Sequence, residues 1–227
     1  ISVNRFEIEA NASFTLNNNF AVENLLSNAG TLILGSSIHT ISGDLGYAQL
    51  TGGVLDINFN STTNYGQLAV TNNVDFTQSG KINLNIGALV KVGDVFSNVV
   101  SAGAAFNSPT AGFSVTDDSR LLNFSTSVAS GSLNITTIDD SSTSIAQSVA
   151  AMSQGRASKG AAIKLDEIIA SNPSGDWQNV IGAFNSLSTD QQIAEAANQT
   201  SPTLSGATNS AIIETVANAM RVVQLHQ

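Results

Sequence analysis

The residue types that could carry acid–base or metal chemistry are scarce in this sequence and lie far apart. His39 and His226 are the only histidines, and neither has a carboxylate at ligand spacing. A metal site needs three or four converging ligands, so we expect no metal site and a structural or incidental role for both histidines. The chain has no cysteine, which excludes disulfides and thiolate ligands and is compatible with export.

The acidic residues occur in pairs whose neighbours indicate structural roles. We expect Asp117-Asp118 to form a polar turn, Asp139-Asp140 to precede a helical region, and Asp166-Glu167 to lie on a solvated helix face. A glycan-cleaving enzyme would need acids clustered on one exposed face together with Lys or Arg, but only two lysines precede residue 139. We therefore predict no catalytic, cofactor-binding or metal-binding residues, no cofactor, and no enzymatic activity in the chain.

Charge and hydropathy exclude several kinds of partner. The net charge is −9, and the eight Lys and Arg residues are scattered singly, so no phosphate-neutralising stripe can form. We expect no nucleic-acid partner and no peripheral binding to anionic lipid. No apolar run approaches the roughly 18 residues that a membrane-spanning helix needs.

The first part of the chain has the periodicity of β-strands. From residue 1 to residue 138 the apolar residues fall in short runs of period 2, which Gly, Asn, Asp or Ser separates every 8 to 12 residues. Between residues 14 and 60 a similar strand recurs about every 20 residues, which is typical of one rung of a parallel β-helix. Strand periodicity alone does not distinguish a solenoid from a sandwich. We predict a mainly β fold, a right-handed parallel β-helix (solenoid) with a capping β region and a C-terminal α-helical segment.

From Asp139 onward the pattern changes to Ala-rich segments with apolar residues at helical spacing. Trp177 and Phe184 lie on one face of a predicted helix, and Ile212 and Val216 belong to a later apolar stripe. We predict three or four helices, in which these four residues make the packing contacts.

The change of pattern divides the chain into three predicted parts. We expect β-helix rungs over 1–62, a capping β region over 63–138, and a helical linker region over 139–227. Within the helical part, Ser188 and Gln191 have the spacing of a capping box.

Four strand motifs in the β part follow one another in a characteristic order. A "GG-x-L-x-I" strand is followed by "Y-x-x-L-x-V", then by "G-x-I/L-x-L-x-I", and then by "G-D-x-F". In this sequence the motif positions are Gly52, Gly53, Leu55, Ile57, Tyr65, Leu68, Val70, Gly80, Ile82, Leu84, Ile86, Gly93, Asp94 and Phe96. The order resembles the C-terminal passenger (autochaperone) region of a classical, barrel-containing bacterial type V autotransporter. The segment from residue 165 to 207 resembles the helical linker of that family, and the likeness covers about residues 30 to 220.

The resemblance implies a role in outer-membrane secretion by a Gram-negative bacterium. In that family a translocator barrel inserts in the outer membrane, and the passenger crosses it and folds outside, beginning at its C-terminal rungs. The implied location is the cell surface, the outer membrane or the medium. The implied partners are the chain's own C-terminal barrel, which lies outside this sequence, the barrel-assembly machinery and periplasmic chaperones.

We expect the stable end of the β part to be the place where folding begins. Its strands would gain roughly 1.5–3 kcal/mol for each large side chain that becomes fully buried. The predicted folding core consists of Leu55, Ile57, Leu68, Val70, Phe76, Ile82, Leu84, Ile86, Phe96, Phe113 and Phe124.

Two other functions stay open at this point. The chain could be an adhesin or a self-association surface that uses Asn/Thr ladders on an exposed β face and contacts a host surface or a second copy. Alternatively, it could belong to a secreted enzyme or toxin whose active part lies upstream of Ile1. The chain begins without an initiator Met, and we expect it to be a piece of a longer polypeptide.

Overall fold

The computed structural model describes residues 3–140, 142–152, 156–171 and 173–200. Within them it has seventeen strands followed by four helices. The strands are β1 (Arg5–Ile8), β2 (Ser13–Leu16), β3 (Phe20–Ala21), β4 (Leu25–Asn28), β5 (Thr31–Leu34), β6 (Ile38–Ser42), β7 (Gly46–Gln49), β8 (Val54–Ser61), β9 (Asn64–Tyr65), β10 (Gln67–Val70), β11 (Val74–Asp75), β12 (Lys81–Ile86), β13 (Val95–Ala102), β14 (Phe106–Asn107), β15 (Ser114–Asp117), β16 (Leu122–Ala129) and β17 (Ser132–Asp139). The helices are α1 (Ile145–Ala151), α2 (Arg156–Ala170), α3 (Asp176–Asn185) and α4 (Asp190–Gln199).

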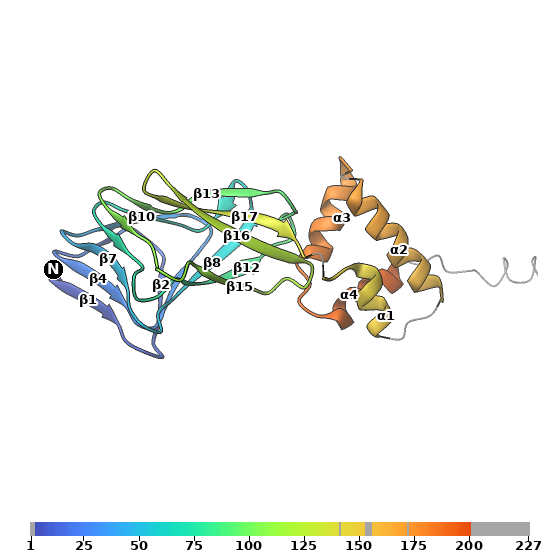
Figure 1. The fold of residues 1–227 in the computed structure, drawn as a ribbon, viewed down its shortest axis with the longest axis horizontal. Helices are drawn as coiled ribbons and strands as arrows, with labels where there is room; N and C mark the ends of the chain where they lie inside the picture. Colours follow the sequence, from blue (N-terminus) through green and yellow to red (C-terminus); the bar gives the residue numbers. More distant parts are fainter. Residues whose placement is uncertain (1–2, 141, 153–155, 172, 201–227) are drawn as a thin grey trace, which may run out of the picture.

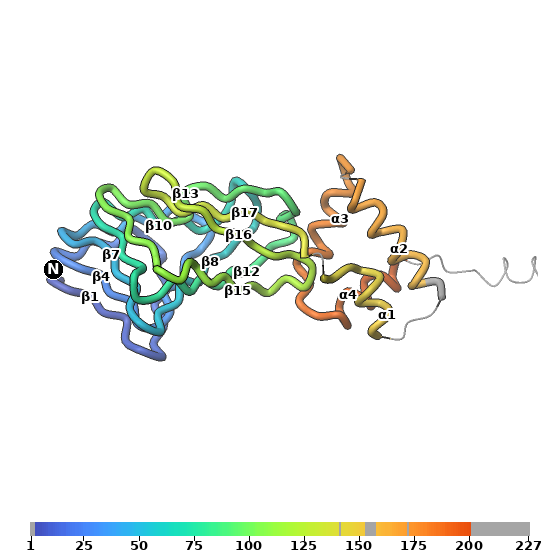
Figure 2. The backbone as a smooth tube through the Cα atoms, in the orientation of Figure 1, coloured from blue at the N-terminus to red at the C-terminus, as the bar shows by residue number. Residues whose placement is uncertain are grey.

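The strands form three sheets, which the chain visits in a repeating order (Figure 1). Sheet A has the order β1-β4-β7-β11-β14, sheet B the order β2-β5-β8-β12-β15, and sheet C the order β3-β6-β10-β13-β17-β16. We call one pass through sheets A, B and C a circuit. Successive circuits stack with parallel strands, so each apolar strand is covered by its equivalent in the next circuit (Figure 2).

The strand register aligns inward residues of successive circuits in columns. In sheet A the pairing joins Phe6 to Leu26, Leu26 to Tyr47, Tyr47 to Val74 and Val74 to Phe106. The first two steps are about the 20 residues that the sequence pattern indicates, and the last two are longer. The register follows from period-2 patterning, because a slip of one residue would expose every buried side chain of a strand.

The strand direction changes at the end of the β region. Strand β17 pairs antiparallel with both β13 and β16, and Ser130 and Gly131 connect β16 to β17 with positive φ angles of 50° and 74°. Two successive positive φ angles are typical of a two-residue hairpin turn, and glycine adopts them at little steric cost. Leu133 and Ile135 of this hairpin lie in the same apolar cluster as the earlier strands, so the hairpin continues the core.

The helices lie at one end of the molecule and have an apolar cluster of their own (Figure 1). Its buried members include Ile145, Val149, Phe184 and Ile193, which come from α1, α3 and α4. No described helix is both long and apolar enough to cross a bilayer.

The coarser prediction of a mainly β fold with parallel sheets and a C-terminal helical part is confirmed. A right-handed β-helix stays a prediction, because strand order alone does not define the hand of the path. The last strand ends at Asp139 and the first helix begins at Ile145, close to the expected change of architecture.

Candidate functional site

In the described ranges, no three His, Cys, Asp or Glu side chains gather where they could hold a metal ion. The candidate site is built from packing and hydrogen-bonding features of the described residues. Three features stand out: the apolar interior of circuits three and four, the polar groups buried beside it, and the corner that carries the helices.

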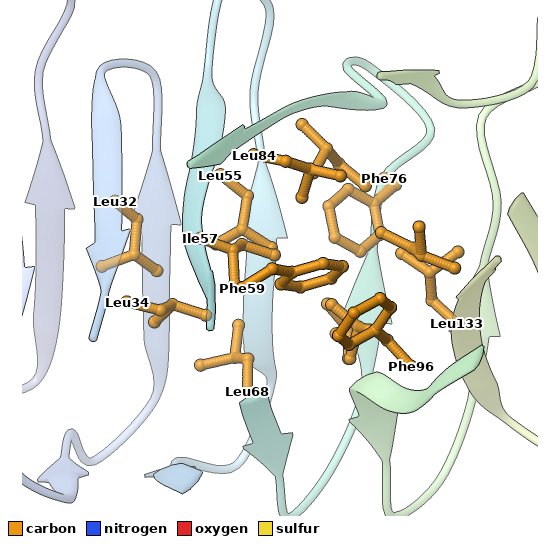
Figure 3. Packing of buried hydrophobic residues seen from close by; sticks show 14 of the residues in the cluster. Leu32, Leu34, Leu55, Ile57, Phe59, Leu68, Phe76, Leu84, Phe96 and Leu133 are labelled. Carbon is orange, nitrogen blue, oxygen red and sulfur yellow. The ribbon is translucent and has the colours of Figure 1, made fainter. Parts of the chain in front are cut away.

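Ten of the eleven predicted folding-core residues are buried and lie in one cluster. They are Leu55, Ile57, Leu68, Val70, Phe76, Ile82, Leu84, Ile86, Phe96 and Phe124. Phe113 is only partly buried and packs against that cluster. Figure 3 shows Leu55, Ile57 and Leu84 pointing from neighbouring strands toward the same interior. Whether this interior folds first remains a prediction.

An aromatic cluster fills the interior between β8 and β13. The rings of Phe59 and Phe96 stack with centroids 3.9 Å apart and an interplanar angle of 24°. Tyr65 meets both rings edge-on, at 5.7 Å and 5.1 Å. Its hydroxyl donates to the Ser97 carbonyl oxygen at 2.8 Å. The ring therefore belongs to the core, while its hydroxyl ties β9 to β13.

A buried polar network, which the sequence did not predict, lies between sheets A and B. Asn28 Nδ2 donates to Tyr47 Oη at 3.3 Å, and Tyr47 Oη donates to Gln49 Oε1 at 2.8 Å. Gln49 Nε2 donates to the carbonyl oxygens of Ser79 and Lys81. Burial raises the pKa of the Tyr47 hydroxyl, which keeps it a neutral donor. The network satisfies backbone groups at the corner where three circuits turn, as buried polar groups require.

His39 is buried within sheet C. Its Nε2 lies 3.0 Å from Ser37 Oγ, and burial lowers its pKa. A neutral imidazole suits its column, because Leu68 of the next circuit pairs with it in sheet C.

A ladder of polar side chains runs across the outer face of sheet B. Asn83 Nδ2 donates to Asp56 Oδ2 at 2.9 Å, and Asn85 Nδ2 donates to Asp56 Oδ1 at 2.6 Å and to Asn58 Oδ1 at 3.0 Å. Thr116 Oγ1 donates to Asn83 Oδ1 at 3.1 Å. These bonds join β8, β12 and β15 on the outside while their apolar residues join them on the inside.

Asp117 occupies the last position of an apolar column. The pairing in sheet B joins Ile57 to Leu84 and Leu84 to Asp117. Burial raises the pKa of Asp117 to about 6, although the Ser119 backbone N–H donates to its Oδ1 at 2.9 Å. We expected a polar turn at Asp117-Asp118, and the structure places Asp117 at the end of β15. Its carboxyl group is half-buried because it continues the apolar column of Ile57 and Leu84, and this burial is the main cause of the raised pKa.

The helices are attached at the corner between sheets B and C. Arg120 Nε donates to Asp190 Oδ1 at 3.0 Å, and the Arg120 backbone N–H donates to the Leu187 carbonyl oxygen at 2.8 Å. Asn185, which is 4% exposed, donates from Nδ2 to the Val90 carbonyl oxygen at 3.0 Å. These contacts bind one short loop of α3–α4 to two loops of the β region.

Gly182 allows α3 to approach the loop after β12 closely. A Cβ at this position would collide with the Ala88 carbonyl oxygen. The close approach therefore requires glycine at position 182. The sequence alone does not indicate that position 182 requires glycine, because Gly182 lies inside an ordinary helical pattern.

A cavity of about 480 Å³ lies beside these contacts. Lys91, Asp139, Ser144, Ile169 and Ile181 are among the residues that line it. Hydrogen bonds beside this cavity hold the helices against the β region, and the two apolar clusters stay separate.

The residues that we expected to pack the helices differ in their exposure to solvent. Phe184 is 4% exposed and belongs to the helical cluster. The prediction for Trp177 is wrong: this side chain is 44% exposed, because it lies in the first turn of α3, ahead of the part that packs. Ile212 and Val216 lie outside the described residues.

Two local predictions in the helices need correction. Thr189, not Ser188, is the N-cap of α4, and its side chain accepts from the Gln192 backbone N–H at 3.2 Å. Asp166 is not merely on a solvated face, because its two carboxylate oxygens accept from the backbone N–H groups of Ile145 and Ala146 at 3.0 Å each. The carboxylate of α2 thus satisfies the free N-terminal donors of α1, a contact that only tertiary packing creates.

No protein-family model matches this chain, and no curated protein sequence is significantly similar to it.

Proposed function

We propose that the chain is the non-catalytic stem of an autotransporter passenger, whose stable C-terminal β region nucleates folding and supports secretion to the cell surface. The proposal includes a right-handed β-helical path for the three-sheet circuits. It also includes the partners of such a stem, which are its own C-terminal translocator barrel, the barrel-assembly machinery and periplasmic chaperones. The location is the surface, or the surroundings, of a Gram-negative bacterium.

The observation that carries the proposal is the continuity of the apolar interior up to an antiparallel hairpin. Each circuit contacts only its neighbours, so folding can spread from one stable end. The end with β13, β16 and β17 supports nucleation, because it joins a local hairpin to the aromatic stack of Phe59 and Phe96. Burying several large side chains there yields roughly 1.5–3 kcal/mol each, which favours folding on the far side of a membrane without another energy source.

The outer polar ladder favours a second candidate function. Asp56, Asn58, Asn83 and Asn85 form a continuous polar row on the outside of sheet B, and such a surface suits an adhesin or a contact between copies. In this alternative the inner core is only a scaffold, and Asn83→Ala with Asn85→Ala would abolish adhesion while leaving secretion normal. A third and weaker candidate is a secreted enzyme or toxin with its active part upstream.

The test compares an inward and an outward residue of the same strand in the parent protein. Phe96 is fully buried in β13, whereas its neighbour Val95 is 51% exposed. Phe96→Asp should abolish surface display, because the folded chain would either have to bury the charge or leave its core open to water. Val95→Asp should be displayed normally, because this side chain is exposed. Antibody labelling and protease accessibility of intact cells measure display.

A second core variant, Leu84→Asp, should behave as Phe96→Asp does. Protease resistance of the purified chain checks that each core variant has lost its folded interior. Normal display of both variants, despite that loss, would contradict the proposed folding role.

A further inference from the structure

The cavity between the β region and the helices has an enclosed inner side and an opening to solvent. Leu121, Ile145 and Asn185 line it and are buried. Val92 and Asp139 also line it, and both are exposed. Its volume of about 480 Å³ lies within the range of roughly 300–1,000 Å³ that is typical of small-molecule sites. The cavity is therefore large enough for a small organic molecule, which can enter it from solvent.

Both parts of the molecule contribute apolar walls to this cavity. Leu121 precedes β16, whereas Ile145, Ile169 and Ile181 belong to α1, α2 and α3. Ile169 and Ile181 are only partly buried, so each keeps apolar surface that a ligand can cover. Removing such surface from water is favourable in proportion to its area. The walls therefore favour a ligand with an apolar body.

Most polar side chains that line the cavity already have a hydrogen-bond partner in the chain. The side chains with such a partner are Thr143, Ser144, Asp166, Gln178 and Asn185. Lys91 and Asp139 are different: within the part of the chain that the structure describes, neither side chain forms a hydrogen bond or an ion pair. Two charged groups of opposite sign are thus left to interact with a ligand.

Lys91 and Asp139 lie on neighbouring segments of the β region. Lys91 is in the loop before β13, Asp139 ends β17, and these two strands pair antiparallel. The pairing continues into the loop, because the Gly93 N–H donates to the Thr137 carbonyl oxygen at 2.9 Å. Lys91 also lies near Asp94, where its charge opposes the rise that burial causes in the pKa of that carboxyl group. One positive and one negative group therefore face the cavity from the same side.

We propose that this cavity binds a free α-amino acid with an apolar side chain. Lys91 holds the carboxylate of the ligand, Asp139 holds its ammonium group, and the isoleucines of the three helices cover its side chain. A purely anionic ligand would be repelled by Asp139 and a purely cationic one by Lys91, whereas a zwitterion pairs with both. The inference goes beyond the proposed function as a secreted stem and does not depend on it.

Such a ligand contacts both parts of the molecule at once. Its charged groups bind the β region, and its side chain binds α2 and α3, which lie beyond the ends of β16 and β17 (Figure 1). A ligand that binds only the attached arrangement of the helices stabilises that arrangement by mass action. The amino acid therefore strengthens the attachment of the helices to the β region.

Isothermal titration calorimetry of the 227-residue chain with L-phenylalanine tests the site. This ligand has about 12 non-hydrogen atoms, and we expect saturable binding with a Kd on the order of 1 mM or below. L-phenylalanine amide lacks the carboxylate, N-acetyl-L-phenylalanine lacks the ammonium group, and glycine lacks the apolar side chain. Each of these three compounds should bind more weakly by roughly tenfold or more.

Two conservative substitutions locate the charges. Lys91→Gln should weaken the binding of L-phenylalanine roughly tenfold, with no further loss when the amide replaces the amino acid. Asp139→Asn should do the same, with no further loss for the N-acetyl compound. Lys81→Gln and Asp44→Asn are the matched controls, because they remove the same charges from exposed positions that do not line the cavity. Both controls should leave the Kd unchanged.

Hydrogen exchange followed by mass spectrometry gives a second measurement. Saturating L-phenylalanine should slow amide exchange in α2 and α3 of the natural chain. At the same ligand concentration, the effect should be much smaller in Lys91→Gln and in Asp139→Asn. Slower exchange confined to segments that do not line the cavity would place the ligand elsewhere and would contradict the proposal.

Three calorimetric results would also overturn it. The first is the absence of saturable binding of L-phenylalanine. The second is equal affinity for the amino acid and either blocked compound, which would show that only one charge is recognised. The third is an unchanged Kd in Lys91→Gln, which would show that the Lys91 charge acts on Asp94 and not on the ligand.

Discussion

At the residue scale, the position of a side chain in a column determines its chemistry. Leu84 and Asp117 are neighbours in one column, yet the first contributes to the core and the second introduces a carboxyl group into it. Desolvation disfavours the charged form of that group, and Asp118 and Asp140 add repulsion. The position is therefore suited to a neutral side chain.

Asp117→Asn should stabilise the chain at neutral pH. The pKa of Asp117 is raised from 3.8 to about 6, so between these values the folded state holds a proton that the unfolded state releases. The contribution of Asp117 to the free energy of unfolding of the natural chain therefore falls as the pH rises from about 4 to about 6, and it is constant above pH 6. We expect Asp117→Asn to raise the free energy of unfolding by about 1–2 kcal/mol at pH 7, after discounting for partial exposure, and to have little effect below pH 4.

Urea unfolding at the two pH values measures this effect. Asparagine can still accept from the Ser119 N–H, so the strand end should keep its shape. Asp44→Asn, in an exposed loop position, controls for the loss of one negative charge. Equal stabilisation by Asp117→Asn at both pH values would show that burial of the charged form is not the cause.

At the element scale, the contact between α3 and the loop after β12 depends on the absence of one side chain. Gly182 lies against the Ala88 carbonyl oxygen, and Asn185 one turn later donates to the Val90 carbonyl oxygen. Helix α3 therefore approaches the loop through two features, the absence of a side chain at Gly182 and the hydrogen-bonding side chain of Asn185. The helices are attached by shape as well as by hydrogen bonds.

Gly182→Ala should weaken this attachment, and Gly160→Ala is its control. A Cβ at 182 forces helix and loop apart, and we expect a loss of about 1–3 kcal/mol. A Cβ at 160, in α2, meets nothing within 4 Å, so alanine should stabilise that helix by up to about 1 kcal/mol. Chemical denaturation, monitored by circular dichroism, measures the free energy of unfolding and shows whether each substitution lowers or raises it. A stabilising Gly182→Ala would mean that the close approach does not hold the helices.

At the scale of the whole molecule, two apolar clusters are joined by a polar corner. The larger cluster runs through the circuits and the terminal hairpin, and the smaller one joins the helices and Leu121. Between them lie the Arg120–Asp190 ion pair and the cavity. A partly exposed ion pair contributes little energy, so the coupling between the two parts depends on a few local contacts, which are the hydrogen bonds of Asn185 and Arg120 and the close approach at Gly182.

The two parts should therefore unfold separately. Leu55→Ala removes a buried side chain from the larger cluster and should cost about 2–5 kcal/mol there, and Ile193→Ala should do the same to the helices. Hydrogen exchange followed by mass spectrometry should show faster exchange only in the part that carries the substitution. Faster exchange in both parts, for both variants, would indicate one cooperative unit instead.

The sequence by itself determined the nature of the elements and the inward residues of the strands. Alternation at Leu55, Ile57, Leu84 and Ile86 predicts which side of each strand is buried, because a strand has only two faces. The change to helical spacing after Asp139 is equally local. Neither inference requires knowing which strand pairs with which.

Only the tertiary structure decided the contacts that join distant segments. Burial of Asn28, Tyr47 and Gln49 depends on three circuits turning at one corner, and capping of α1 by Asp166 depends on how two helices pack. Trp177 shows the reverse: helical spacing identifies an apolar face, but not where along the helix that face meets a neighbour. Periodicity reports the environment of a residue within its own element, whereas a partner from another element is selected by the free energy of the whole packed chain.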